Sequence, residues 1–410
     1  MLALPFVVLL FTIALAPLLA PTWWQDNRNK ALVALLVSAP ILIYLGINAP
    51  ELLIEKGHEY LSFIVVIGAL FIISGGIHIQ GSLSGTPLVN TAMLGIGAIL
   101  ANLVGTTGAS VLLIRPLLRA NKPRKRVAHI VIFFIFIVAN CGGLLTPIGD
   151  PPLLLGFLKG VPFEWTLRLW PQWLTVNGLL LVIFHVWDRW ALNRDEIELP
   201  GSQHQQVLVH EPLRILGGFE TLLLVAVIAT VVTSGPLILI VALAALSYFA
   251  GSQERREKNV FTFGPIIEVA ILFAAIFATM APVLEMLNAW AQQPDFALHE
   301  PWHFFWASGT LSSVLDNAPT YLAFASAAAG LQGVAPHGPF IGAIERGILA
   351  AISTGAVFMG ANTYIGNAPN FMVKAIAEES GVKMPSFFGY MLYSVGLLIP
   401  LFLAVSLLFF

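Results

Sequence analysis

Two acidic residues lie within long apolar stretches of the sequence, where an ionisable side chain is costly. Asp150 precedes Pro151-Pro152, and Asp316 is followed by Asn317-Ala318-Pro319. An ionisable group at the middle of a bilayer costs about 2.5 to 3.5 kcal/mol on insertion scales, so two retained acids indicate a functional role. A carboxylate is both a hard oxygen ligand and a titratable base. We therefore predict that Asp150 and Asp316 hold a sodium ion transiently and exchange it for a proton.

Neutral polar residues surround both acids in the sequence and are suited to complete the shell of a small ion. Proline and glycine in these segments free backbone carbonyls, which Asn, Thr and Ser side chains can join in binding a cation. Half-helix N-termini at the same breaks offer N–H groups to an anion, so the architecture alone suits either sign of charge. The predicted cation- and proton-binding residues, besides the two acids, are Asn317, Asn140, Thr146, Asn362, Thr363 and Asn367, and the predicted hairpin-tip residues are Thr106, Thr107, Ser312, Ser313 and Thr320.

Each of these residues also has a purely structural interpretation. Asp150 stands where an acid would cap a half-helix that begins at Pro151. We favour the functional interpretation, because Ser or Asn would cap a helix in lipid at lower cost. Asp316 has the stronger case, since the first interrupted stretch has only uncharged residues at its break. Any single Thr or Ser is expected to bond to its own backbone, and only their clustering indicates a site.

The composition determines which elements must position these residues. The chain has 410 residues, of which 58% are hydrophobic and 10% charged, and its mean hydropathy is +0.85. A soluble domain has roughly 25% charged residues, so we predict an all-α polytopic membrane protein that contacts the lipid bilayer. The formal net charge of -2 provides no basic field, which excludes nucleic acid as a partner. The single cysteine, Cys141, excludes a disulfide framework and multi-cysteine metal sites.

Apolar segments of about 20 residues, the length that crosses a bilayer, recur along the chain. Two further apolar stretches, at about 85–118 and 303–330, are interrupted by Gly105-Thr106-Thr107-Gly108 and by the Asp316 segment. Each half is too short to span, so each stretch is predicted to be a re-entrant hairpin whose break faces protein or a wet cavity. The segments at 127–158 and 340–380 are predicted to be broken helices. About ten crossings are predicted, at 2–20, 31–48, 60–80, 127–158, 171–188, 214–233, 237–250, 262–288, 340–380 and 386–410.

The distribution of Lys and Arg orients this topology, because cytoplasmic loops hold an excess of both. An N-terminus outside the cell places 16 of the 20 Lys and Arg residues on the cytoplasmic side. With this orientation the hairpin at 85–118 opens to the cytoplasm and the hairpin at 303–330 opens outward. We therefore predict a multi-pass protein of the bacterial inner (plasma) membrane with its N-terminus outside.

A short internal repeat agrees with the opposed hairpins. The sequence Ile148-Gly149-Asp150-Pro151-Pro152 recurs as Ile365-Gly366-Asn367-Ala368-Pro369. An odd number of crossings per copy turns the second copy upside down. The prediction is two inverted five-helix repeats, at 1–190 and 214–410, joined by a cytoplasmic linker at 191–213.

Motifs of membrane enzymes and pumps are missing from the sequence. Pro147 precedes the Ile148-Gly149-Asp150 segment, so the Gly-x-Gly-Asp motif of aspartyl membrane proteases is absent, and no zincin, nucleophile-elbow or Walker motif occurs. The protein is therefore predicted not to be an enzyme and not to be driven by ATP. Its expected ligands are the transported sodium ion and proton, with no resident cofactor. The alternatives are a proton- or sodium-coupled importer of citrate or a related carboxylate, for which Lys374 is a candidate anion partner, and a non-transporting receptor or membrane-embedded enzyme.

At the same residues the chain resembles the ion transporter superfamily, and within it the citrate-transporter-like group and the D-type bacterial sodium/proton antiporters. The resemblance is carried by 315–320, Leu-Asp-Asn-Ala-Pro-Thr, and by 362–370, Asn-Thr-Tyr-Ile-Gly-Asn-Ala-Pro-Asn. It implies a scaffold domain and a transport domain, hairpins that meet at mid-membrane, elevator-like motion and often a homodimer.

The hairpin tips depart from the dicarboxylate carriers of this superfamily. Those members have Ser-Asn-Thr at both tips, whereas the tips here are Gly105-Thr106-Thr107 and Asp316-Asn317-Ala318. This difference favours cation and proton exchange over carboxylate import.

Overall fold

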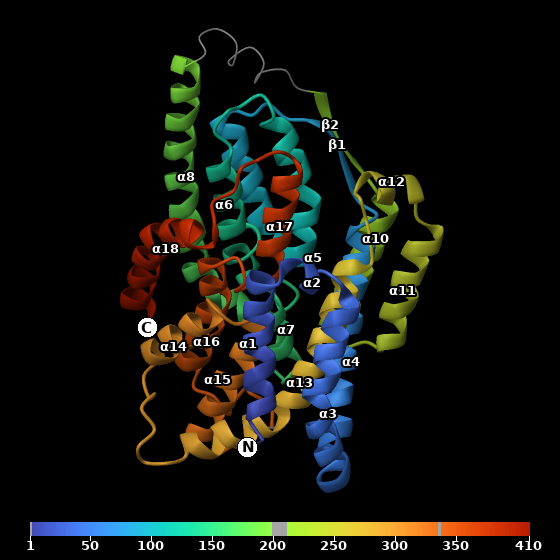
Figure 1. The fold of residues 1–410 in the computed structure, drawn as a ribbon, viewed down its shortest axis with the longest axis vertical. Coiled ribbons are helices and arrows are strands. Elements are labelled where there is room, and N and C mark those ends of the chain that lie inside the picture. The colour runs from blue at the N-terminus through green and yellow to red at the C-terminus, as the bar shows by residue number, and fades with distance from the viewer. Residues whose placement is uncertain (1, 199–210, 335–337) are drawn as a thin grey trace.

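The computed structural model of the protein describes residues 2–198, 211–334 and 338–410 and is mostly helical (Figure 1). The first part contains α1 (Leu4–Leu19), α2 (Pro21–Trp24), α3 (Asn27–Asn48), α4 (Pro50–Ser74), β1 (His78–Ser82), α5 (Pro87–Ala120), α6 (Ala128–Ile137), η1 (Cys141–Leu145), α7 (Pro151–Leu158), η2 (Phe163–Leu169) and α8 (Trp170–Glu198). The second contains β2 (Glu211–Leu216), α10 (Gly218–Val232), α11 (Leu237–Ala250), α12 (Gln253–Lys258), α13 (Gly264–Ala291), α14 (Pro301–Ser312), α15 (Asn317–Leu331), α16 (Arg346–Met359), η3 (Gly360–Asn362), α17 (Ala368–Glu379) and α18 (Phe387–Phe409).

Several helices have the length and composition needed to cross a membrane. Within the described residues, seven are long and apolar enough, and three shorter apolar helices accompany them. The protein is therefore a polytopic, mostly helical membrane protein, as the composition predicted. The number of crossings and their division into two repeats stay predictions. The seven are Asn27–Asn48, Pro50–Ser74, Pro87–Ala120, Ala128–Leu145, Phe163–Asp195, Gly264–Ala291 and Phe387–Phe409.

A small β-sheet departs from the all-helical expectation. β1 and β2 pair in antiparallel fashion, with His78 opposite Leu216. The predicted crossing at 60–80 therefore ends as a helix at Ser74, and the one at 214–233 begins as a helix only at Gly218. Each predicted crossing extended a few residues beyond its helix, because Ile77 and Ile79 before Leu83, and Ile215 and Leu216 before α10, continue the apolar run into more polar strand residues. The pairing satisfies backbone groups of the two strands, and the side chains of Arg256 and Asn259 donate to carbonyls at the end of α4.

The structure also differs in part from the predicted linker at 191–213. Helix α8 continues through Glu198, so the first residues of this segment are helical. Between Gly178 and Pro200 the sequence contains no Pro or Gly that would end the helix. Residues 199–210 of the linker lie outside the described part of the chain.

The first interrupted stretch folds back on itself. Helix α5 contains a break at Gly105, whose φ of 78° lies in the left-handed region that favours glycine. Asn90 and Asn121, near the two ends of the stretch, exchange side-chain hydrogen bonds of 2.9 and 2.8 Å. The two legs therefore begin and end together, and the break at Gly105 forms the tip.

Corresponding breaks interrupt three other apolar segments. Residues 313–316 separate α14 from α15, Asn140 and residues 146–150 flank η1 between α6 and α7, and residues 363–367 lie between η3 and α17. The broken helices occupy the middle of the molecule (Figure 1). There α5, α6, α7 and α17 lie between α8 and α18 on one side and α3, α4, α10 and α11 on the other. From Ile130 to Ile137, helix α6 is apolar around its whole circumference and buried, which is expected of a central helix.

The contact between α14 and α16 leads to a stability prediction. A Cβ atom at Gly355 would lie 2.4 Å from the carbonyl oxygen of Phe305 and 2.8 Å from Ser308 Oγ. Close helix packing through small residues stabilises membrane helices. We expect Gly355→Ala to lower the free energy of unfolding by about 1–3 kcal/mol, because the two backbones must separate. Thermal unfolding in detergent measures this change.

Gly396→Ala in α18 is the matched control. A Cβ atom at Gly396 would meet nothing within 4 Å, so this variant gains only helix propensity. Equal unfolding temperatures for the two variants would contradict the proposed close contact.

Candidate functional site

The carboxylate of Asp150 lies where several breaks meet, immediately before α7. Only 1% of Asp150 is exposed, and its side chain does not cap the helix that follows. Its Oδ1 accepts hydrogen bonds from the Thr106 hydroxyl at 2.7 Å and from Asn367 Nδ2 at 3.3 Å. The amide of Asn317 donates to Oδ2. One acid therefore gathers donors from both hairpin tips and from the second broken helix.

Backbone bonds fix the first hairpin tip against the loop that holds Asp150. The Thr106 N–H donates to the Gly149 carbonyl at 2.8 Å, and the Thr146 hydroxyl donates to the Asn102 carbonyl at 2.5 Å. The side-chain oxygen of Asn102 accepts the Leu145 N–H at 2.8 Å. Asn102 was not among the predicted site residues. Its role is to satisfy backbone groups that the break leaves unpaired.

Three asparagines form a buried chain behind Asp150. Asn140 Nδ2 donates to Asn370 Oδ1 at 2.7 Å, and Asn367 Nδ2 approaches Asn140 Oδ1 at 3.2 Å. Asn370 Nδ2 donates to the carbonyls of Gly360 and Thr363 at 2.8 and 2.9 Å. The sequence predicted Asn140 and Asn367 but missed Asn370. Its spacing of three residues from Asn367, which places both on one helix face, is the signal that would have found it.

Asp316 takes the capping role that the sequence suggested for Asp150. Its Oδ1 accepts the Ala318 N–H at 3.1 Å at the start of α15, and its carbonyl accepts the Thr320 hydroxyl at 2.9 Å. Asp316 is partly exposed, whereas Asp150 is buried. Asn317, which follows Asp316 in the chain, donates to Asp150 and so links the two acids. The structure thus brings both predicted acids to one region but gives them different surroundings.

Most of the predicted hydroxyls maintain the shape of the breaks. They donate to backbone carbonyls, which is the structural interpretation considered for single Ser and Thr residues. The half-buried Thr107 lines a cavity next to Asp150. The hydroxyls of Thr363, Ser312 and Ser313 donate to the carbonyls of Ser313, Ala356 and Gly309 at 2.5, 2.6 and 2.9 Å, respectively. The amide of Asn362 donates to Ser313 Oγ at 2.9 Å.

The side-chain oxygens of two asparagines near the breaks accept no hydrogen bond from the residues that the structure describes and could each bind a ligand. Within the described residues, Asn317 Oδ1 and Asn362 Oδ1 are buried without a hydrogen-bond partner. A buried oxygen left unpaired costs about 1–3 kcal/mol, and an oxygen ligand of this kind suits a small cation. The described part of the chain contains no group of three or more His, Cys, Asp or Glu residues placed to hold a metal ion. An ion bound here would rely on one or two carboxylates and on amide oxygens.

A narrow cavity of about 70 Å³ reaches this site from between α4 and α13. Asp150, Thr106 and Thr107 form its polar end, and side chains such as Ile67 and Ile266 form apolar walls. A cavity of this size holds a few water molecules or a small ion. The buried Asp150 carboxylate therefore lies at the end of a small cavity that could admit an ion or water.

Comparison with known proteins adds one finding. A protein-family model whose description reads "Putative citrate transport" matches residues 1–410, the whole chain. None of the curated proteins compared with the chain matches it.

The asparagine chain generates a prediction about the integrity of the site. Asn370→Ala removes the Asn370 donor from the carbonyls of Gly360 and Thr363 and leaves Asn140 Nδ2 with the Ile135 carbonyl as its remaining acceptor. We expect the free energy of unfolding to fall by about 1–3 kcal/mol, the usual cost of unpaired buried polar groups. Chemical unfolding in detergent measures it.

The control is Asn48→Ala. Asn48 makes one exposed bond, of 2.9 Å, to a carbonyl in its own helix. A loss of stability in the control that equals the loss in the Asn370 variant would refute the special role of the buried chain.

Proposed function

The chain belongs to the citrate transport family that it matches over its whole length, and we propose that it is a secondary active transporter that exchanges a sodium ion for a proton at Asp150. The observation that carries this proposal is the setting of the carboxylate. Its hydrogen-bond partners Thr106, Asn317 and Asn367 are all neutral. An acid held without a cationic side chain is suited to take either a proton or a metal ion as its counter-charge.

Competition between the two ions is a sufficient basis for exchange. One carboxylate cannot be protonated and coordinate sodium at the same time, so each ion displaces the other. If only the loaded site moves readily across the membrane, this competition couples the two fluxes in opposite directions. In this proposal the unpaired Asn317 Oδ1 supplies a further ligand, and Asp316 adds a second negative charge nearby. The ligands are the transported sodium ion and proton.

Two inverted repeats are a further part of the proposal, supported by matching contacts in the two halves. The Thr146 hydroxyl bonds to the Asn102 carbonyl, and the Thr363 hydroxyl bonds to the Ser313 carbonyl. In each half two glycines six residues apart approach closely, at 143 and 149 and at 360 and 366. Asp150 and Asn367 occupy equivalent places before α7 and α17, each followed by Pro in the first helical turn. At this pair of equivalent positions one proposed repeat has an acid and the other an amide.

Citrate or a related carboxylate is the second candidate substrate, because the family description names citrate. A free tricarboxylate would need a cationic pocket, and the predicted anion partner Lys374 is engaged with Glu378 at 2.8 Å. A citrate that arrives as a metal complex would carry its own cation and would tolerate an acid at the site. The family and the helical membrane fold fit transport in either case rather than catalysis.

Ion flux in proteoliposomes tests the main proposal. With a pH gradient and a pH-sensitive dye inside, addition of sodium is expected to release protons. Asp150→Asn is expected to abolish this response, since an amide neither titrates nor balances the charge of sodium. Citrate-dependent uptake without a sodium response would overturn the proposal in favour of the second candidate.

Asp316→Asn separates the roles of the two acids in the same assay. Asn caps a helix about as well as Asp, so the fold is expected to remain. Loss of one negative charge near the site is expected to raise the sodium concentration for half-maximal response roughly tenfold. This change corresponds to a loss of about 1.4 kcal/mol of binding free energy. An unchanged response would restrict Asp316 to capping.

The membrane orientation is testable because the chain has one cysteine. Cys141 is buried, so it should not react with a membrane-impermeant maleimide. We propose that the N-terminus lies outside the inner membrane. Lys122→Cys should then be labelled only in inside-out vesicles and Gln293→Cys only in right-side-out vesicles, since both positions are exposed. The opposite labelling would reverse the topology.

The homodimer implied by the resemblance is also part of the proposal. The molecular mass of the purified protein in detergent tests it.

A further inference from the structure

A large open cavity of about 970 Å³ lies at the mouth of the first hairpin, away from Asp150. Its walls come from the second leg of α5 and the loop at 121–127, from α8 around Trp187 and Trp190, from the turn at 380–383 that follows α17, and from Tyr393 of α18. Seven of the described residues that line it are Lys or Arg, and none is acidic. We call it the basic cavity.

Part of this positive charge is compensated behind the wall. Arg124 pairs with Asp188 and Arg126 with Asp195, each at 2.6 Å, and both aspartates are buried. Glu379 interacts with one further arginine of the lining. The basic side chains outnumber these acids, so the basic cavity keeps an excess of positive charge. A concave surface with such an excess concentrates anions.

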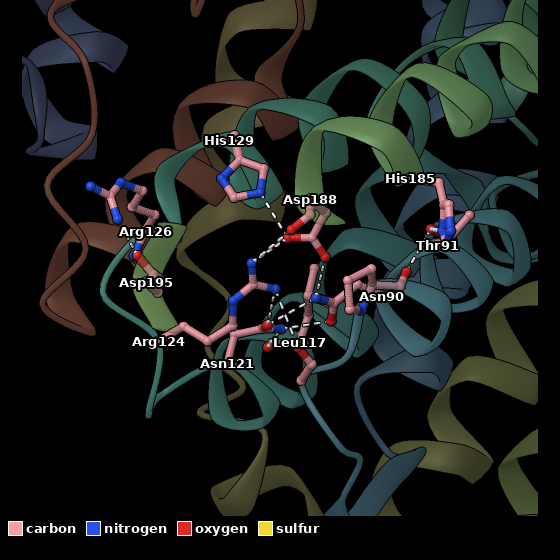
Figure 2. Close-up of polar contacts among 12 residues, drawn as sticks. Asn90, Thr91, Leu117, Asn121, Arg124, Arg126, His129, His185, Asp188 and Asp195 are labelled. Atoms are coloured by element: carbon pink, nitrogen blue, oxygen red, sulfur yellow. Dashed lines mark hydrogen bonds and ion pairs between the residues drawn. The ribbon is translucent and has the colours of Figure 1, made fainter. Parts of the chain in front are cut away.

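The hydrogen bonds around Asp188 hold the wall of the basic cavity in a fixed arrangement (Figure 2). Asp188 Oδ1 contacts Arg124 and His129 Nε2, the latter at 2.8 Å, and Asp188 Oδ2 accepts Asn90 Nδ2 at 2.9 Å. Arg124 also reaches the carbonyl of Gly85 at 3.2 Å. Its Nε is buried without a hydrogen-bond partner among the described residues. The buried Arg124 therefore holds the wall in place and adds fixed positive charge behind it, while exposed lysines of the lining, such as Lys122 and Lys383, are accessible to an anion.

The surroundings of the basic cavity indicate where an anion would come from. Val182, Val186 and Trp190 lie one turn apart on α8 and are all exposed, so they form an apolar stripe that ends at the cavity. α8 is among the helices long enough to span the membrane. Trp187, Trp190 and Tyr393 line the cavity itself, and Trp and Tyr gather where lipid headgroups lie. A diffusing anion would need no apolar stripe, whereas a phospholipid uses one for its acyl chains.

We propose that the basic cavity binds the phosphate headgroup of an anionic phospholipid, whose acyl chains lie along the Val182–Trp190 stripe of α8. Lys122, from the loop at 121–127, and Lys383, from the turn at 380–383, contact the headgroup, and Arg124 holds the wall behind them. Basic pockets between membrane helices on the cytoplasmic side are suited to such headgroups. The bound lipid joins the mouth of the first hairpin to α8 and to the turn that follows α17.

Lipid retention by the purified full-length protein tests this inference without any transport measurement. The protein is reconstituted in nanodiscs of phosphatidylcholine alone or of an equimolar mixture with phosphatidylglycerol, and bound lipids are counted by native mass spectrometry. The wild-type protein is expected to retain phosphatidylglycerol in preference to phosphatidylcholine. The double variant Lys122→Gln/Lys383→Gln, at two exposed positions, is expected to bind phosphatidylglycerol roughly tenfold more weakly.

Arg28→Gln/Arg214→Gln is the control variant, because it removes two exposed charges from outside the basic cavity. It should bind phosphatidylglycerol as the wild type does. Equal losses in both variants, or no loss in the Lys122/Lys383 variant, would overturn the proposal. A separate calorimetric titration with inorganic phosphate should show no saturable binding. Saturable phosphate binding that the Lys122/Lys383 variant lacks would assign the basic cavity to a soluble anion instead of a lipid.

Discussion

The burial of the Asp150 carboxylate is the constraint on which the rest of the structure depends. An ionised acid in apolar surroundings is stable only when hydrogen-bond donors replace the water that it has lost. The chain supplies these donors from Thr106, Asn317 and Asn367, which are separated by up to 261 positions in sequence. Three interrupted segments must therefore converge on the fourth, which holds Asp150. The breaks that make this convergence feasible leave backbone groups unpaired, and the hydroxyls and amides around them, such as Thr146 and Asn102, satisfy those groups.

Much of this arrangement could be predicted from the sequence because its signals are local. Breaks in apolar stretches are visible as Gly, Pro, Asn and Asp where a membrane helix should be uninterrupted, and Asp150 stands out by charge alone. The repeat of Ile-Gly-Asp-Pro-Pro as Ile-Gly-Asn-Ala-Pro also indicated that two segments would have related shapes. These features depend on residue type and spacing, which the sequence shows directly.

The remaining features depend on distant contacts and side-chain direction. Both acids precede a proline-containing first helical turn, yet Asp316 caps its helix and Asp150 does not, because Asp150 has competing donors from elsewhere in the chain. The pairing of β1 with β2 joins residues 129 to 138 positions apart, and hydropathy alone did not reveal it. The cluster of Arg124, Asp188 and Asn90 likewise forms only once α8 packs beside the mouth of the first hairpin.

The distribution of polar and apolar contacts around Asp150 limits how the site could be exposed to either side of the membrane. Moving the hairpin tips away from Asp150 would remove the donors Thr106 and Asn317 and leave the buried carboxylate with Asn367 alone, at a cost of several kcal/mol. If both tips slide together with Asp150 past α4 and α13, those bonds stay intact. The cavity walls there are apolar side chains such as Ile67 and Ile266, which form no hydrogen bonds that sliding would break. α8 would have to move with this unit, since Asp188 ties it to the first hairpin through Asn90.

Several polar contacts oppose such a displacement. Arg115 and Arg119 of the first hairpin donate to the carbonyls of Asn259 and Ile79 at 3.4 and 3.1 Å. Lys159, directly after α7, pairs with Glu59 of α4 at 2.5 Å, and the buried Lys56 pairs with the same acid at 3.0 Å. A rigid movement of α7 along α4 must break or exchange the Lys159 pair. Because Lys56 remains beside Glu59, the acid keeps one cationic partner when Lys159 leaves. The cluster therefore favours the observed position of the unit without fixing it there, and the apolar walls around Asp150 leave sliding as the movement of lower cost.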